Sequence, residues 1–126
     1  MAAAVADFRP ETSADDKLKK DLGPPEVRLV PTPDILLELG SAGGTVLVGF
    51  AAETREVEAS GREKLRRKGV QLLVANEVGR EGTGFGSDTD LAAILAADGE
   101  DVGMREWTKP ELASAICDRL AKLLTF

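Results

Sequence analysis

Residues 45–76, TVLVGFAAETREVEASGREKLRRKGVQLLVAN, decide the fold. Two short apolar runs, 45–50 and 70–75, flank a segment that is rich in charged residues. Each run has the length and near-continuous hydrophobicity of a strand that is buried on both faces. The segment between them predicts a helix, with Thr54 as a candidate N-cap and Gly69 as a candidate stop. Strands joined by a crossover helix lie parallel, so this stretch predicts an α/β fold with a parallel pair at its centre.

Downstream of the parallel pair, the chain predicts a β-hairpin and a long helix. Residues 91–97 are rich in alanine and leucine, which also favour a helix, but the run is short. It is followed by Asp98-Gly99-Glu100-Asp101, which has the composition of a hairpin turn, and then by a strand candidate at 102–107, so a hairpin is preferred. Thr108 and Glu111 have the spacing of a capping box, which marks the start of the last helix. Apolar residues then recur at helical spacing and predict one buried face, in which the single cysteine is a core thiol. They are Leu112, Ala113, Ile116, Cys117, Leu120, Leu123 and Leu124.

Upstream of the pair, the chain alternates between short apolar and polar segments. The expected elements are a buried strand at 1–8, a polar loop at 9–25, a strand at 27–30 and a helix at 34–39 ended by Gly40. A glycine-rich loop is expected at 79–88. Together these elements predict a single domain, 1–126, with a partial Rossmann-like three-layer sheet followed by a C-terminal β-hairpin and helix.

Composition excludes several classes of function. The chain has 126 residues, of which 43% are hydrophobic and 30% charged, as expected for one globular domain. A net charge of −6 argues against general nucleic-acid binding. The absence of histidine and the presence of one cysteine exclude a Ser-His-Asp triad, a Cys-His pair and zinc sites of the histidine or multi-cysteine kind. No apolar run is long enough to span a bilayer, and a lone thiol indicates a cytoplasmic protein.

Some polar and aromatic residues are placed where a ligand could bind. Asp7, Phe50 and Asn76 lie at or near the ends of predicted strands, where open α/β sheets gather their ligands. The run Lys17-Leu18-Lys19-Lys20 is either a solvated charge run or a cationic flap that closes on an anion. Lys64 and Lys68 share a helix face and either complement the helix dipole or form a second anion contact.

Seven short motifs occur in a characteristic order along the whole chain. They are AAVADFRP, KLKK, PDIL, VGFAAET, KLRRKG, VAN-V and FGSD. In this order and spacing they resemble the C-terminal half of phosphopantothenate–cysteine ligase, the phosphopantothenoylcysteine synthetase of coenzyme A biosynthesis.

This resemblance implies a reaction and a set of site residues. The family uses CTP and Mg²⁺ to activate the carboxylate of 4′-phosphopantothenate as an acyl-cytidylate, from which the amine of cysteine then displaces CMP. Lys17 is implied to approach the phosphates as the catalytic cation, and no residue is implied as a metal ligand. The implied nucleotide-binding residues are Ala3, Ala4, Asp7, Lys17, Pro33, Asp34, Ile35, Leu36, Phe50, Lys64 and Lys68.

The family pattern also includes a preceding half that this sequence does not contain. That half carries a glycine-rich strand–loop–helix and an Asn-containing segment, and the present chain begins inside the family's central strand. We therefore expect an excised portion or part of a longer polypeptide, in some relatives fused to a flavin-dependent decarboxylase, and a homodimer. Three readings stay open: the nucleotide-binding part of an active ligase, a non-catalytic nucleotide-binding or dimerisation module, and an unrelated α/β domain with a chance basic loop.

Overall fold

The structure is a computed structural model that describes residues 5–79 and 86–125. The described chain divides into two compact units, a larger one from Leu36 onward and a smaller one that ends at Ile35. The larger unit contains a four-stranded sheet with strand order β3-β4-β5-β6. Its strands are β3 (Val48–Glu53), β4 (Leu72–Glu77), β5 (Thr89–Ala96) and β6 (Val102–Thr108). Its helices are α1 (Ile35–Ala42), α2 (Val57–Lys68) and α3 (Lys109–Leu124).

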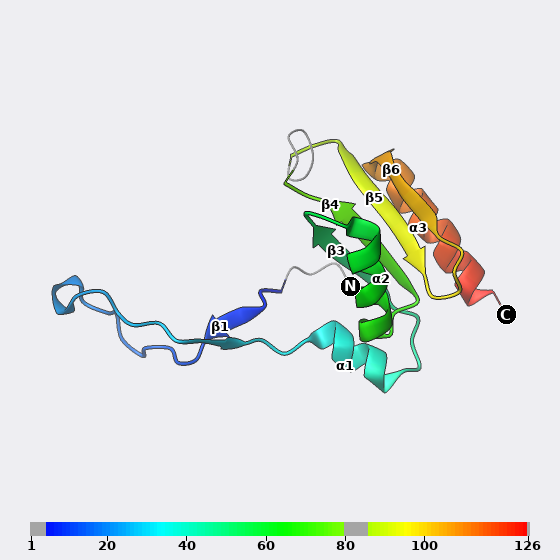
Figure 1. The fold of residues 1–126 in the computed structure, drawn as a ribbon. Helices are drawn as coiled ribbons and strands as arrows, with labels where there is room; N and C mark the ends of the chain where they lie inside the picture. The colour runs from blue at the N-terminus through cyan, green and yellow to red at the C-terminus, as the bar shows by residue number, and fades with distance from the viewer. Residues whose placement is uncertain (1–4, 80–85, 126) are drawn as a thin grey trace. The chain divides into compact units, whose positions relative to one another are not determined.

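The predicted α/β class is confirmed, and so is the parallel pair at its centre. β3 and β4 run parallel and are joined by α2, whereas β5 runs antiparallel to both of its neighbours, β4 and β6. Helix α2 covers one face of the sheet and α3 the other, which makes three layers (Figure 1). The predicted hairpin of two strands corresponds to β5 and β6, and the predicted capping box at the start of α3 is present.

The start of α2 and the start of β4 differ from the prediction, whereas the end of α2 agrees with it. Gly69 does end α2, in a left-handed conformation, and its N–H donates to Arg66 O. The Val70 N–H donates to Leu65 O in the same cap, so β4 begins only at Leu72. Thr54 is not the N-cap of α2. That position is taken by Glu56, which has φ 46° and makes no side-chain capping bond.

The core lies in two layers, one on each face of the sheet. Between α2 and the sheet, Gly61 lets the helix approach closely, since a Cβ there would lie 2.7 Å from Leu95 Cδ1 and 2.9 Å from Ala75 Cβ. Between the sheet and α3, the buried Trp107 donates its indole N–H to Ala92 O at 2.9 Å. Arg119 of α3 is almost fully buried and forms ion pairs with Asp98 and Glu100 at the β5–β6 turn.

Two expectations for the helices are wrong. Cys117 is exposed rather than buried, as are Ala113 and Leu124, because α3 turns the side of Leu112 and Arg119 toward the sheet instead. Gly40 does not end α1 but lies inside it. A Cβ at Gly40 would lie 1.8 Å from the Lys68 carbonyl oxygen, so glycine is required there by close packing against the end of α2.

The smaller unit is a two-stranded antiparallel ribbon with a long connection. β1 (Phe8–Pro10) pairs with β2 (Leu29–Pro31), and a short 3-10 helix, η1 (Lys20–Leu22), interrupts the connection between them. The predicted buried strand at 1–8 is wrong for residues 5–8, which are all exposed, and its first four residues lie outside the described part. The polar loop is confirmed as mostly irregular and exposed. Within the described ranges, no helix has the length and apolar character needed to cross a bilayer.

Two carboxylates of the larger unit have pKa values that the fold lowers. A hydrogen bond from the Glu100 N–H holds down the pKa of Asp98, and Arg119 adds to this effect. The pKa of Glu111 is lowered mainly by the Thr108 N–H, at 2.9 Å, and next by the Thr108 hydroxyl, at 2.7 Å. In each case a donor stabilises the charged form.

Acid should therefore destabilise the larger unit through these two groups. Their ordinary pKa values are 3.8 for Asp and 4.5 for Glu, and folding lowers both. Below those values the unfolded chain binds more protons than the folded chain, so their stabilisation is present above about pH 4.5 and is lost as the pH falls through the folded values. Melting temperatures measured from about pH 6 down to about pH 3 should fall less steeply in Glu111→Gln and in Asp98→Asn. Glu106→Gln, which changes an exposed carboxylate on β6, is the control, and equal slopes in all variants would contradict the prediction.

Candidate functional site

The carboxyl end of the parallel pair is the natural place for a ligand in this unit. β3 and β4 end in register, with Glu53 opposite Glu77, and α2 begins shortly after β3. Parallel α/β sheets bind ligands outside the carboxyl ends of their strands, where the first turns of the crossover helices also lie. This edge therefore offers strand-end side chains together with side chains of α2.

Phe50 lies in the middle of β3 rather than at its end, because β3 extends three residues beyond the predicted strand. Its neighbours Gly49 and Ala51 face α2 and are buried, so alternation turns Phe50 to the other face of the sheet. There the ring is 48% exposed. β3 is an edge strand of this sheet, and an exposed aromatic ring on such a strand is available to stack on a planar group.

Lys64 contacts Glu53 at the carboxyl end of β3. The Lys64 Nζ lies 2.5 Å from Glu53 Oε1, and the side chains are 37% and 14% exposed. The lysine therefore leans toward the strand ends, as expected from the tilt of helical side chains toward the helix N-terminus. Lys68 is half-buried one turn further along α2. The predicted shared anion contact of Lys64 and Lys68 stays a prediction.

The hollow at this edge that the structure outlines is acidic. It has a volume of about 580 Å³ and is lined by Glu56, Val57, Glu58, Ala59, Glu77, Leu91 and Met104. Three carboxylates would repel a polyphosphate, so this hollow does not suit a phosphate ligand. The described residues include no group of three or more acidic or thiol side chains that could hold a metal ion.

The remaining predicted residues belong to the smaller unit. Asp7 is exposed, and its backbone carbonyl accepts a hydrogen bond from the Thr32 N–H at 2.8 Å. Lys17 is exposed in the connection between β1 and β2, where Leu18, Lys19, Lys20, Gly23, Pro24 and Pro25 line a hollow of about 510 Å³.

The segment Pro33–Leu36 spans the division between the two units. Pro33 and Ile35 are exposed and Asp34 is half-buried, while Leu36 belongs to the larger unit and is part of its core. Ala3 and Ala4 lie outside the described residues. A common binding site for Asp7 and Phe50 stays a prediction.

Comparison with known proteins supplies the family. The model of the DNA/pantothenate metabolism flavoprotein C-terminal domain matches residues 1–124. The chain belongs to this family. The match covers nearly the whole sequence and confirms the resemblance that the seven motifs indicate.

Relatives of this flavoprotein C-terminal domain family agree in sequence and in fold. The coenzyme A biosynthesis bifunctional protein CoaBC of Bacillus subtilis (strain 168) is 43% identical over 122 residues, which are 96% of this chain and 30% of that protein. CoaBC of Mycobacterium tuberculosis (strain ATCC 25618 / H37Rv) is 40% identical over 136 residues, covering 98% of this chain and 32% of that protein. The crystal structure of a CoaBC C-terminal domain superposes with a TM-score of 0.71 at 32% identity, covering 97% of this chain and 52% of that chain. The chain thus spans about a third of these relatives and half of the solved domain.

Glu53 is not among the site residues that the sequence predicts. It is the sixth residue of the VGFAAET motif, yet nothing in its spacing pairs it with Lys64, eleven residues later on α2. The available signal was a carboxylate directly after an apolar strand, a position that brings a side chain to the carboxyl edge of the sheet.

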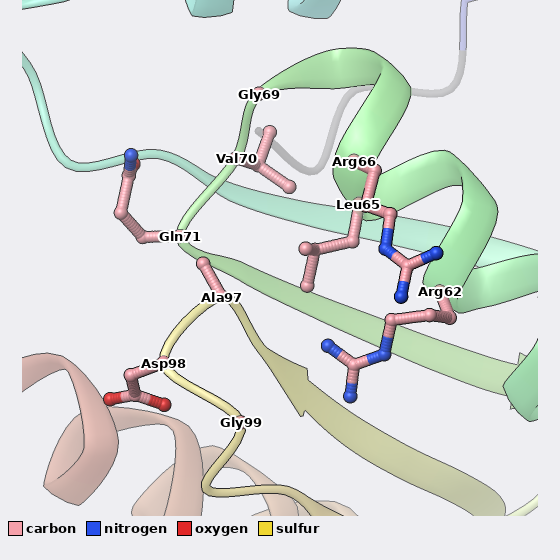
Figure 2. Close-up of a pocket in the computed structure, with 9 residues that line it drawn as sticks. All are labelled: Arg62, Leu65, Arg66, Gly69, Val70, Gln71, Ala97, Asp98 and Gly99. Carbon is pink, nitrogen blue, oxygen red and sulfur yellow. The ribbon is translucent and has the colours of Figure 1, made fainter.

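A third hollow lies in the larger unit, at the opposite ends of the strands. Figure 2 shows Arg62 and Arg66 projecting from α2 beside the turn that follows β5. Arg62 donates to Ala96 O at 2.7 Å and forms an ion pair with Asp101, so it ties α2 to this turn. The pocket has a volume of about 640 Å³, and none of the predicted site residues lines it. We assign its arginine–turn contacts to the stability of the fold.

Proposed function

We propose that this chain is the nucleotide-binding part of a CTP-dependent ligase of coenzyme A biosynthesis. The complete ligase joins 4′-phosphopantothenate to cysteine through an acyl-cytidylate. The observation that carries the proposal is the family match over residues 1–124. The ion pair of Lys64 with Glu53 at the carboxyl end of the parallel strand pair supports it, because it puts a cation where such sheets bind ligands. CoaBC relatives at 40–43% identity are coenzyme A biosynthesis proteins by name, which supports the pathway.

The proposed residues divide by chemistry. Lys17, Lys64 and Lys68 are cations for the triphosphate, and Phe50 offers an exposed ring to the base. Asp7 is proposed on the nucleoside side, where a carboxylate accepts hydrogen bonds from hydroxyl or amino groups. The backbone and side chains of Ala3, Ala4, Pro33, Asp34, Ile35 and Leu36 complete the proposed nucleotide contacts.

The chemistry requires charge stabilisation more than proton transfer. A carboxylate oxygen of 4′-phosphopantothenate attacks the α-phosphorus of CTP, the bond to the β-phosphate oxygen breaks, and pyrophosphate leaves. The cysteine amine then attacks the acyl carbon and CMP leaves with the electron pair of the broken C–O bond. Lysine ammonium groups offset the negative charge that builds on the leaving pyrophosphate, and this work needs no histidine. Mg²⁺ is commonly held by the phosphates and one or two carboxylates, so it would be carried mainly by the triphosphate.

The proposed partners follow from the share of the relatives that this chain covers. About half of the solved CoaBC C-terminal domain lies outside the match, so a preceding half of the ligase is proposed as an obligatory partner. A homodimer is proposed as the assembly on the family resemblance alone. Fusion to a flavin-dependent decarboxylase and a cytoplasmic location stay predictions. The same coverage favours one alternative, in which the isolated chain binds nucleotide or dimerises without turnover.

Product formation tests the function directly. An intact ligase domain that contains this chain, incubated with CTP, Mg²⁺, 4′-phosphopantothenate and cysteine, should release pyrophosphate and CMP and form 4′-phosphopantothenoylcysteine, measured by mass spectrometry. ATP in place of CTP is the control for the nucleotide. The 126-residue chain alone, tested beside it, should bind CTP without turnover if the alternative holds. An intact domain that forms no product, or that uses ATP equally well, contradicts the proposal.

A further inference from the structure

Glu53 is a carboxylate in an unusually enclosed position for a residue at a strand end. It is the last residue of β3, its side chain is only 14% exposed, and its Oε1 is shut off from solvent. Two preceding residues on the same face, Gly49 and Ala51, are buried, the first beside Leu36 and the second in the core layer under α2. A charged group in such surroundings is costly unless a partner of opposite charge compensates it.

Lys64 is that partner. Its Nζ lies 2.5 Å from Glu53 Oε1 as an ion pair, without the alignment of a hydrogen bond. The two residues are carried by different elements, the edge strand β3 and the helix α2 that follows it. The contact therefore holds the end of the long, flexible Lys64 side chain against a mostly buried carboxylate on a strand. It differs in this from an ion pair between two exposed side chains.

We propose that Glu53 is the positioning residue for Lys64 and holds its ammonium group at the carboxyl edge of β3 for the triphosphate of CTP. This inference depends on the proposed function, in which Lys64 binds a phosphate. A lysine already held at the right place loses less freedom on binding than one that samples many rotamers. The enclosed Oε1 of Glu53 is the oxygen that contacts the lysine ammonium group, so the carboxylate holds Lys64 at the end of β3.

A double-mutant cycle tests the pair. CTP binding to an intact ligase domain that contains this chain is measured by calorimetry, without 4′-phosphopantothenate, for the native protein, Glu53→Gln, Lys64→Met and the double variant. We expect Glu53→Gln to weaken CTP binding about tenfold. The double variant should bind no more weakly than Lys64→Met, because Glu53 acts only through the lysine. In parallel, the same four forms of the 126-residue chain are melted without nucleotide. We expect the two substitutions to have non-additive effects on stability, which reports the ion pair without any contribution from CTP.

The controls separate the inference from the proposed function. Glu77→Gln removes the carboxylate at the register position next to Glu53 and should not weaken CTP binding, because Glu77 does not hold Lys64. Glu53→Asp keeps the charge and should bind CTP better than Glu53→Gln. If Glu53→Gln folds poorly, Glu53→Asp takes its place in the comparison with the native protein. Unchanged or tighter CTP binding in Glu53→Gln, with weakened binding in Lys64→Met, overturns the role of Glu53 and leaves the proposed function standing. Unchanged binding in Lys64→Met overturns both the role of Lys64 and that of Glu53.

Discussion

Replacement of Lys17 by Gln should lower the rate of pyrophosphate release in an intact ligase domain by about 10²- to 10³-fold. Lys17 is fully available for this role, because it lies exposed in the irregular connection between β1 and β2. A cation placed on a developing phosphate charge acts mainly in the transition state, whereas its removal from an exposed loop changes stability by less than about 0.5 kcal/mol. The expected result is a normal melting temperature with most acyl-cytidylate formation lost.

The measurement is pre-steady-state pyrophosphate release beside a thermal melt. The cysteine step should be affected less, since pyrophosphate has already left when it occurs. Arg28→Gln is a matched control, because it removes one positive charge from an exposed side chain of the same unit. Normal pyrophosphate release in Lys17→Gln would return the Lys17-Leu18-Lys19-Lys20 run to an ordinary solvated charge run.

Substitution of Gly61 by Val should destabilise the larger unit by about 3 kcal/mol. A single Cβ at this position already lies 2.7 Å from Leu95 Cδ1 and 2.9 Å from Ala75 Cβ, and Val adds two further methyl groups. Because Gly61 faces the centre of the sheet, relief requires α2 to lift from β4 and β5 and so opens the core layer beneath it. The slight gain in helix propensity from Gly to Val is too small to compensate.

Urea unfolding of the 126-residue chain, followed by the fluorescence of its single tryptophan, measures this effect. Trp107 is buried on the opposite face of the sheet and reports unfolding without touching the mutated site. Glu63→Val places the same side chain on an exposed position of α2 and should change stability by less than about 1 kcal/mol. Equal stability of the two variants would contradict the close approach of α2 to the sheet.

Parts of the candidate site could be predicted from sequence, but only at the level of elements. The motif order indicates the family, and the apolar runs around α2 indicate the parallel pair whose carboxyl edge attracts ligands. Lys64 could be placed on a helix face by its spacing to Lys68. Its ion pair with Glu53 could not, because that contact depends on how α2 lies across β3, and no local pattern encodes this distance.

The sequence by itself determined the elements whose causes are local. The Thr108–Glu111 capping box and the left-handed Gly69 stop depend on neighbouring residues, so their patterns are sufficient. For β5 the turn signal after it favours a hairpin, whereas its alanine and leucine content favours a helix, and sheet pairing decides for the strand. Only the tertiary structure decided which side of an element is covered. Cys117 is exposed because α3 packs through a neighbouring face. Gly40 lies within α1, and it is glycine because the Lys68 carbonyl leaves no room for a side chain there. Burial is set by partners distant in sequence, and hydrophobic periodicity alone does not encode where those partners lie.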